Sequence, residues 1–286
     1  ADREILSVIP RSFTLDNQTG IRSPQGMTGN RLEVNVHVIT GATHVVRNLK
    51  KCLHLAGLDT NILVPSALAV SQLVSSDERE LGVCIADIGS GTTDLILLSE
   101  GAPAWMQVVP MGGELLTHDL AVALKTPLGD AEKLKIQHGY AHTSFAPVVD
   151  GVQVRKIADR PSEMISLQQL TAFLQPRVEE IAEILGERLR HSGWFEEIST
   201  GLVLSGGSAG LPGIADVFES ILQCPCRVLK GDHLEGLDAL LKDPANAVLA
   251  GLLVYGRDQE LRPGQNWLRA QKGILKRIRR WVQRNF

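Results

Sequence analysis

The sequence predicts an α/β protein in which helices pack around a mixed or parallel sheet. Two observations predict this class: apolar strands alternate with helical segments along the chain, and two of the strands run into glycine-rich turns. With 286 residues, of which 44% are hydrophobic and 21% charged, the chain is long enough for two ordinary domains. No apolar run reaches the roughly 18 residues that a membrane-spanning helix needs.

The first strand that we expect covers residues 31–40, where apolar and polar side chains alternate with the period of a half-buried strand. Residues 42–56 follow as a helix with one apolar face. A short strand at 61–64 leads to a helix at 65–74, and Pro65 stands in its first turn, where proline is tolerated.

Three further strands are expected at residues 80–87, 95–98 and 102–110, because each is a short apolar run bounded by turn residues. A helix from 112 to about 124 follows them. The segment 127–200 is expected to be mostly helical, including a helix over 167–189 that proline interrupts at Pro176. The remaining elements are a strand at 201–205 and helices at 211–222 and 245–255.

The residues best suited to chemistry lie in the turn Asp87–Asp94, which joins two apolar strands. Glycines let backbone N–H groups converge on an anion, and the threonine hydroxyls add donors. Asp87, at the strand end, is placed to hold a hydrated magnesium ion beside phosphates. A glycine turn alone also fits an ordinary hairpin, but a second one, Gly206-Gly207-Ser208, follows another apolar strand. Together the turns predict two sides of one nucleotide cleft. The cysteines and histidines show no spacing typical of another metal site.

These motifs resemble those of the actin-like ATPase superfamily. Asp87–Asp94 is similar to its second phosphate loop, and Val203–Gly213 to its adenosine motif. Thr126–Lys135 is similar to the segment in which a glutamate and a lysine, here Glu132 and Lys135, reach the ribose and base. The alternative for these two residues is a solvated pair on a helix. The resemblance implies ATP and Mg as cofactors, bound by Asp87 (Mg through water), Gly89, Ser90, Gly91, Thr92, Thr93, Glu132, Lys135, Gly206, Gly207 and Ser208.

The resemblance narrows to the FtsA family of bacterial cell division proteins. The stretches that carry it are Val8–Phe13, Asp77–Cys84, Gly129–Lys133, Gln137-His138-Gly139, Gln175-Pro176-Arg177 and Lys276–Phe286. Family members tether the tubulin-like FtsZ to the inner membrane and polymerise like actin. This implies a peripheral protein on the cytoplasmic side of the inner membrane at the septum. The implied partners are the FtsZ C-terminal tail, other division proteins, anionic lipid and further copies of the chain, but no nucleic acid.

The resemblance also implies an actin-like (ribonuclease H-like) fold, truncated at its N-terminus, whose first phosphate loop precedes this sequence. Residues 1–31 would end the family's extra subdomain, 32–79 and 245–257 would belong to the first large subdomain, 80–113 and 200–244 to the second, and 114–199 to a small subdomain that docks FtsZ. Residues 258–272 would form a linker and 273–286 a membrane-targeting helix. Where hydrolysing relatives carry Glu-Pro, this chain has Val64-Pro65, so no carboxylate orders the attacking water and we expect slow hydrolysis or none.

Arg177 matches a family position implicated in binding the FtsZ tail. Such tails are acidic as well as apolar, and a guanidinium is a suitable anchor for a carboxylate. The alternative is an ordinary surface arginine that follows a helix-breaking proline.

The C-terminal segment has a charge pattern unlike the rest. From Arg262 onward there are eight Lys and Arg and no acid, which leaves 21 basic against 32 acidic side chains in residues 1–261. On a helical wheel the apolar side chains of 273–286 occupy an arc of about 140°, with cations on the rest. A rod of roughly 21 Å lies in a membrane interface but does not cross it. The membrane-binding residues that we expect are Ile274, Leu275, Lys276, Arg277, Ile278, Arg280, Trp281, Val282, Arg284 and Phe286.

Other interpretations remain open from the sequence. The amphipathic segment could instead pack on the protein's own core or on a partner; a nucleic-acid arm would not need six aligned apolar side chains. The alternatives to a tethering scaffold are an ATP-hydrolysing phosphotransferase or chaperone of the same superfamily, and a PilM-type pilus-assembly adaptor.

Overall fold

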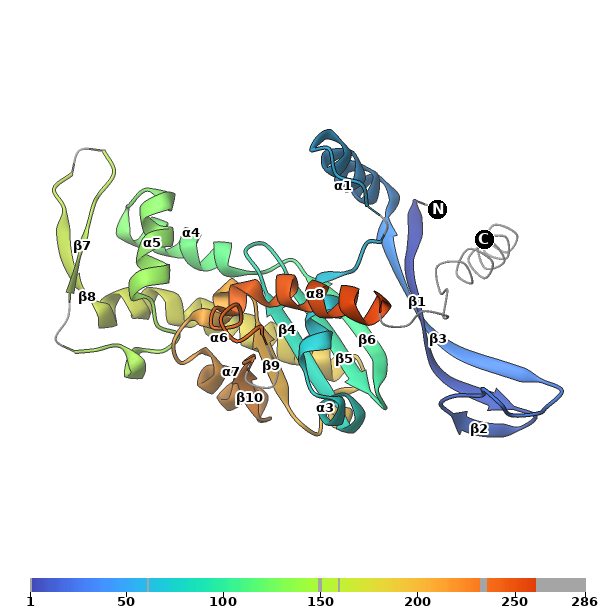
Figure 1. Ribbon diagram of the computed structural model, residues 1–286. Coiled ribbons are helices and arrows are strands. Elements are labelled where there is room, and N and C mark those ends of the chain that lie inside the picture. Colours follow the sequence, from blue (N-terminus) through green and yellow to red (C-terminus); the bar gives the residue numbers. More distant parts are fainter. Residues whose placement is uncertain (1, 61, 149–150, 159, 232–235, 261–286) are drawn as a thin grey trace. The chain divides into compact units, whose positions relative to one another are not determined.

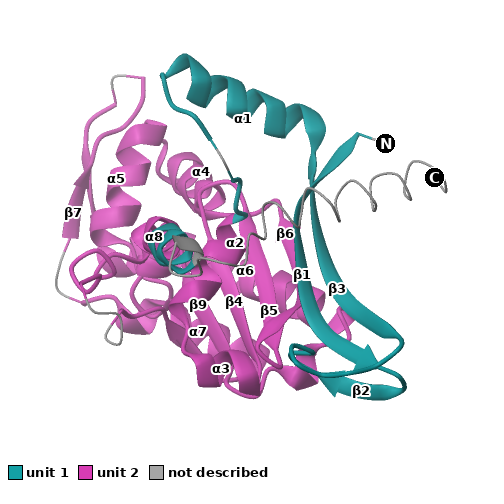
Figure 2. Cartoon of the chain, turned by 45° about the vertical axis from the view of Figure 1, so that its right-hand side comes forward, with its two compact units in different colours: residues 1–65, 252–286 teal, residues 66–251 magenta. Residues whose placement is uncertain are grey.

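The computed structural model describes residues 2–60, 62–148, 151–158, 160–231 and 236–260 (Figure 1). The chain divides into unit 1, residues 1–65 and 252–286, and unit 2, residues 66–251 (Figure 2). Within the described residues, no helix has both the length and the apolar character needed to cross a membrane. The predicted helix at 273–286, its membrane-binding residues and most of the predicted linker lie outside the described residues.

Unit 1 is built on an antiparallel sheet of order β2-β1-β3, formed by β1 (Arg3–Leu15), β2 (Gln18–Ile21) and β3 (Leu32–Ala42). The Asp16 carboxylate accepts hydrogen bonds from the amides of Asn30 and Arg31 and so fixes the start of β3. The predicted strand at 31–40 is confirmed as β3, and the predicted helix at 42–56 as α1 (Thr43–Leu55). The strand expected at 61–64 is wrong for 62–64, which have no regular structure.

Unit 2 is organised around a five-stranded mixed sheet of order β10-β9-β4-β5-β6. Its strands are β4 (Val83–Ile88), β5 (Thr93–Ser99), β6 (Ala102–Val109), β9 (Leu202–Ser205) and β10 (Cys226–Val228). β4, β5 and β6 form an antiparallel meander, whereas β9 runs parallel to both β4 and β10. Every residue of β4 and β9 is buried, which explains why both read as continuous apolar runs rather than alternating ones.

Helices lie around the sheet of unit 2, and most of them contribute buried side chains to its core (Figure 1). They are α2 (Ser66–Val70), α3 (Ser76–Leu81), α4 (Gly113–Leu124), α5 (Leu128–His138), α6 (Leu167–His191) and α7 (Ile214–Leu222), with α8 (Ala247–Glu260) beginning in this unit. Short 3-10 turns occur at Ser71–Leu73, Thr143–Phe145 (η2), Phe195–Glu197, Gly207–Gly210 (η4) and Pro244–Asn246. The side chain of Phe218 on α7 is fully buried in this core.

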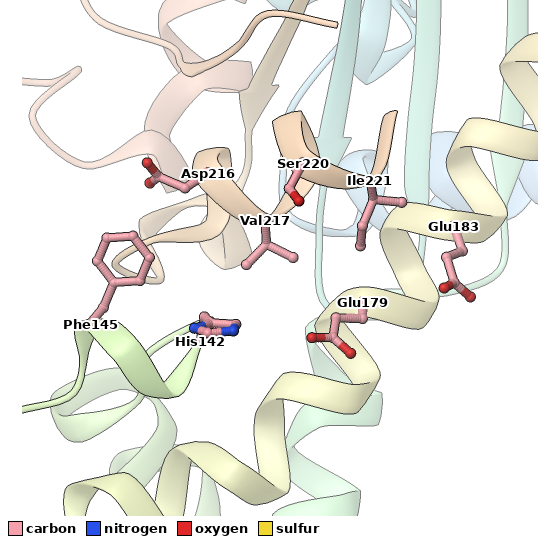
Figure 3. A pocket seen from close by; sticks show the side chains of 8 residues that line it. All are labelled: His142, Phe145, Glu179, Glu183, Asp216, Val217, Ser220 and Ile221. Atoms are coloured by element: carbon pink, nitrogen blue, oxygen red, sulfur yellow. The ribbon is translucent and has the colours of Figure 1, made fainter. Parts of the chain in front are cut away.

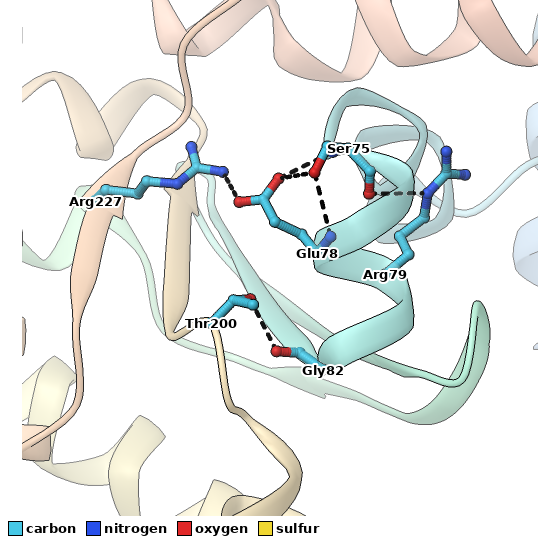
Figure 4. Close-up of polar contacts among 6 residues, drawn as sticks. All are labelled: Ser75, Glu78, Arg79, Gly82, Thr200 and Arg227. Atoms are coloured by element: carbon cyan, nitrogen blue, oxygen red, sulfur yellow. Dashed lines mark hydrogen bonds and ion pairs between the residues drawn. The ribbon is translucent and has the colours of Figure 1, made fainter.

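The strand predicted at 80–87 starts later than expected, because α3 takes its first residues. Ser75 caps α3 by accepting from the Glu78 amide, and the Glu78 carboxylate accepts from the Ser75 amide (Figure 4). Gly82 then turns the chain into β4 with φ 107°, and a Cβ there would lie 1.7 Å from the Glu197 carbonyl oxygen. Thr200 donates to the Gly82 carbonyl, which fastens this corner to the chain entering β9.

Residues 127–200 are mostly helical, as predicted, but the structure adds one element and corrects one detail. Part of the predicted helical segment 127–200 is instead an antiparallel hairpin, β7 (Gly151–Val154) with β8 (Glu163–Ser166). α6 is also continuous through Pro176, where an interruption was expected. Proline removes only one hydrogen-bond donor from the helix, and the buried residues on both sides of Pro176, including Leu174 and Val178, hold the helix to the core.

Candidate nucleotide site

The two glycine turns predicted from the sequence lie beside each other, at the carboxyl ends of the neighbouring strands β4 and β9 of the unit 2 sheet. β4 and β9 are parallel neighbours, and their register pairs Asp87 with Ser205. The Ser205 hydroxyl donates to Asp87 Oδ1 at 3.0 Å, and the Ser208 hydroxyl donates to the Gly89 carbonyl at 3.4 Å. The structure therefore brings together turns that are far apart in the sequence.

Gly206 is required where the two turns touch. Its φ is +86°, and a Cβ there would lie 2.5 Å from the Ile88 carbonyl oxygen and 2.9 Å from Asp87 Oδ1. Only glycine gives this backbone both its conformation and its close approach. Gly207 has no such restriction, because its nearest neighbour would be Ala245 Cβ at 3.8 Å.

The tip of the first turn is open. Ser90, Gly91 and Thr92 are exposed, and their backbone amides donate no hydrogen bond to any other described residue. Gly89 closes the turn by donating to the Thr92 carbonyl at 2.9 Å. Exposed amides held in one turn form an anion-binding concavity. Thr93 differs from the tip residues: it is buried, and its hydroxyl donates to the Met111 carbonyl at 2.8 Å.

Asp87 is buried, with only 7% of its surface exposed. Burial raises the pKa of this carboxyl above its ordinary value, and the nearby charge of Asp94 raises it further, while the hydrogen bond from Ser205 acts in the opposite direction. Asp94 faces Asp87 across β4 and β5, and the Ser66 hydroxyl donates to it. The site thus holds two carboxylates, of which the buried one lacks a cation among the described residues.

Glu132 and Lys135, on α5, form a network with α4. Lys135 Nζ lies 2.7 Å from Glu132 Oε2 and donates to the Gly113 carbonyl at 2.9 Å and to Thr117 Oγ1 at 2.8 Å. The Lys135 side chain is only 11% exposed, which excludes a solvated pair for this residue. Burial opposes ionisation of Glu132, but hydrogen bonds from Lys135 and Thr117 outweigh it and lower the pKa of Glu132.

Gly112 and Gly113 connect this network to the glycine turns. A Cβ on Gly113 would lie 2.4 Å from Ser208 Oγ, and one on Gly112 would lie 2.4 Å from the Ser90 carbonyl oxygen. The Gly113 amide donates to the Gly89 carbonyl at 2.9 Å. Sequence reasoning missed both glycines as site residues, together with Thr117, Ser205 and Ser66. The adjacent glycines directly after a strand were the visible signal for the first two.

Arg177, the predicted FtsZ anchor, lies on α6 and connects it to α4. Its Nε lies 2.6 Å from Asp119 Oδ2, its Nη2 lies 3.2 Å from Asp119 Oδ1, and its Nη1 forms an ion pair with Glu180. The hydrogen bond to Asp119 raises the pKa of Arg177 further, and the charges of Asp119 and Glu180 add to this, against a smaller opposing effect of burial. The guanidinium is thus already bound to two carboxylates of this chain.

Solved structures with this fold are known. The PilM–PilN type IV pilus biogenesis complex matches 89% of this chain and 67% of that chain, with a TM-score of 0.62 and 18% identity. MreB5 of Spiroplasma citri bound to ADP matches 76% of this chain and 67% of that chain, with a TM-score of 0.61 and 20% identity. The predicted class is confirmed: the fold is that of the actin-like proteins.

Sequence comparison identifies the family within this class. Residues 84–251 match the family profile described as cell division protein FtsA, and residues 1–40 match that of the SHS2 domain inserted in FtsA. The cell division proteins FtsA of Pseudomonas aeruginosa and Neisseria meningitidis are 35% identical to this chain, and that of Escherichia coli K12 is 32% identical. Each alignment covers the whole chain and 71% of the relative. The chain belongs to the FtsA family of cell division proteins.

Proposed function

We propose that this chain is a nucleotide-dependent scaffold that tethers FtsZ filaments to the cytoplasmic face of the inner membrane at the division septum. The observation that carries the proposal is the meeting of two glycine turns around Asp87 in a member of the FtsA family. An assembly that holds one filament to a membrane needs binding sites for both and a way to control its own self-association. A nucleotide cleft supplies that control in actin-like filaments.

The residues at the cleft fit ATP with magnesium. The open amides of Ser90, Gly91 and Thr92 suit phosphate oxygens, and the buried Asp87 carboxylate suits a hydrated Mg²⁺. When bound, the magnesium would neutralise phosphate charge. Glu132 is 44% exposed, so its carboxylate is available to ribose hydroxyls while Lys135 holds it in place.

Nucleotide binding can be tested with a fluorescent ATP analogue and the full chain. Asp87→Asn should weaken binding in the presence of Mg²⁺ and leave binding in EDTA unchanged, because the substitution removes only the charge that holds the ion. Glu196→Gln, at an exposed acid elsewhere in unit 2, is the matched control. An identical Mg²⁺ dependence in wild type and Asp87→Asn would contradict the proposal.

Little or no ATP hydrolysis is part of the proposal, because Val64 stands where a carboxylate would order the attacking water. Turnover at about one per second or faster would favour a phosphotransferase or a nucleotide-driven chaperone instead. The similarity to the PilM–PilN complex concerns the fold, and the FtsA relatives at 32–35% identity over the whole chain favour cell division over a pilus adaptor.

We propose that FtsZ docks on residues 114–199, near Arg177. For the other subdomains, we propose the boundaries that were predicted from the sequence. Because Arg177 is paired with Asp119 and Glu180, an incoming acidic tail would have to replace one of these carboxylates. A peptide of the FtsZ tail should therefore bind more weakly to Arg177→Gln and more tightly to Glu180→Gln, measured by fluorescence anisotropy. Glu187→Gln, on the same helix, is the control for lost charge. Unchanged affinity in both variants would exclude Arg177 as the anchor.

A further inference from the structure

A second recess in unit 2 lies apart from the nucleotide site, between α7 on one side and α6 with η2 on the other (Figure 3). Its volume is about 460 Å³. Val217 and Ile221 of α7 and Phe145 of η2 make its apolar part, and 42% of Phe145 is exposed. An apolar cavity of about 150 Å³ accommodates a benzene ring, so this recess has room for roughly three ring-sized groups.

The edges of this recess are acidic. Glu179 and Glu183 stand one turn apart on α6, and Asp216 stands across the recess on α7 (Figure 3). Gln175 donates to Glu179 at 2.7 Å, but neither Glu183 nor Asp216 has an ion-pair partner among the described residues. Among the residues that the structure describes, no lysine or arginine lines the recess. Its chemistry therefore suits an occupant with apolar side chains flanked by cations.

We propose that this occupant is the chain's own segment 273–286. In helical projection, the apolar side chains of the segment are flanked by Arg277 and Arg284 on one edge and by Arg279 on the other. The recess offers the complementary pattern, with two carboxylates on the α6 wall and one on the α7 wall. Three apolar groups of the segment fill the available volume, while the remainder of the helix stays outside.

The connecting chain is long enough for this docking. Residues 261–272, fully extended, span up to about 40 Å. A compact domain of the size of unit 2 has a radius of gyration of about 16 Å. The segment can therefore reach most of the surface of its own chain without any rearrangement of the core.

Docking has a consequence for the proposed membrane anchor. The segment has one apolar face, and that face cannot lie in the recess and in a lipid surface at the same time. The two destinations compete, so the fraction of chains ready to bind lipid is reduced by the fraction that is docked. The recess would hold the anchor of a lone chain until a membrane, or the added avidity of an assembly, displaces it.

Docking can be tested on the full-chain variant Arg277→Lys with a carbodiimide, which joins a lysine amine to a touching carboxylate, because position 277 borders the apolar face of the segment. We expect the amine introduced at position 277 to become linked to Glu179, Glu183 or Asp216, detected by mass spectrometry. An equal mixture of ¹⁵N-labelled and unlabelled protein separates the two origins: docking within one chain gives no mixed-isotope pairs. Linkage in which about half of the pairs are of mixed isotope, as random pairing between chains would give, or no linkage at the recess, would overturn the proposal.

The competition with lipid needs a second measurement. Full-chain E179Q/E183Q/D216N should bind anionic phosphatidylglycerol vesicles severalfold more than E100Q/E196Q/E197Q, which also loses three negative charges, at exposed positions that do not line the recess. Equal vesicle binding by the two variants would overturn the competition. The docking proposal and the proposed membrane anchor can fail separately. If the cross-link forms but the chain does not bind vesicles, the membrane anchor is excluded and docking in the recess still holds.

Discussion

Asp87 is the residue on which the candidate nucleotide site depends. It ends β4, faces Ser205 across the parallel pairing with β9, and lies under the glycine of the second turn. The same burial that makes its charge costly removes competing water, so a divalent cation there would gain more than at an exposed carboxylate. The chain therefore keeps an acid at a buried position where an apolar residue would cost less stability, which is expected if the carboxylate is needed for binding.

Gly206→Ala should destabilise the chain by more than a left-handed alanine normally does. A left-handed backbone costs an L-residue about 1–2 kcal/mol. At Gly206 the added Cβ would also lie 2.5 Å from the Ile88 carbonyl, so β4 and β9 must separate. Gly193→Ala is the control for a positive φ alone, because Gly193 has φ +75° and no described atom lies within 4 Å of its Cβ position. Equal losses in urea unfolding would show that the contact with Ile88 costs nothing.

The raised pKa of Asp87 predicts how Asp87→Asn changes stability with pH. The folded state binds this proton more tightly than the unfolded state, so the ionised form costs stability once pH rises above the ordinary value of 3.8. Stability of the wild type relative to Asp87→Asn should therefore fall as pH rises toward the folded pKa, and stay constant beyond it. Urea unfolding at a series of pH values measures this difference. A difference that does not change with pH would mean that burial does not perturb the carboxyl.

Most helices and strands of unit 2 could be predicted because their sequences carry a clear apolar pattern, either a continuous run or a single apolar face. β4 and β9 are buried on both faces and read as apolar runs, and α7 shows a single apolar face. The hairpin β7-β8 was missed because its four-residue strands mix polar and apolar side chains, so they show neither a continuous apolar run nor an alternation long enough to recognise. β10 is shorter still and depends on pairing with β9. Such elements are fixed by tertiary contacts, which no local pattern contains.

The candidate site also has a part that could be predicted from the sequence and a part that could not. Its turns were predictable, because glycine and a strand-ending acid are local signals at Asp87 and Gly206. The supporting residues were not, because Thr117 and Ser66 become neighbours of the site only through the packing of α4 and α2. α3 is an intermediate case: its capping box, Ser75 with Glu78, is visible in the sequence, but the apolar residues that follow suggested a strand.

The ion pair between Glu78 and Arg227 joins α3 to β10, and we expect Arg227→Gln to weaken this connection (Figure 4). Both side chains are partly exposed, so the loss should be about 0.5–1 kcal/mol at pH 7. Burial opposes the charge of Glu78, but hydrogen bonds from Arg227 and Ser75 outweigh it and lower the pKa of this carboxyl. The stabilisation that comes from the charge of Glu78 is therefore fully present at pH values above 4.5, the ordinary pKa of a glutamate. It is lost as the pH falls through the lowered pKa that Glu78 has in the folded state.

A double-mutant cycle checks this interpretation. Glu78→Gln should remove the same interaction, so the double variant should lose less than the sum of the two single losses. Thermal unfolding at pH 7 and near pH 3.5 supplies the comparison. A loss for Arg227→Gln that is equal at both pH values would show that Arg227 acts by packing rather than by charge.

The distribution of charge over the whole chain connects the two proposed roles. Residues 1–261 hold 21 basic and 32 acidic side chains, whereas the rest holds eight basic side chains and no acid. An acidic body is repelled by anionic lipid, so attraction to a membrane has to come from the C-terminal segment. The same charge separation makes the acidic recess of unit 2 and the basic segment complementary. One segment can then serve as an anchor in an assembly and remain docked in a single chain.

Membrane binding should consequently depend on the segment, on salt and on assembly. Six apolar side chains and several cations, at about 1 kcal/mol per cation near anionic lipid, favour binding. Ordering the helix offsets much of this, so a single copy should bind reversibly, whereas copies linked in a filament gain avidity. Co-sedimentation with anionic vesicles should fall steeply with salt, rise cooperatively with protein concentration, and be lost when the chain ends before Gly273. Equal pelleting of the full and shortened chains would exclude the segment as the anchor, because the binding would then come from residues that precede Gly273.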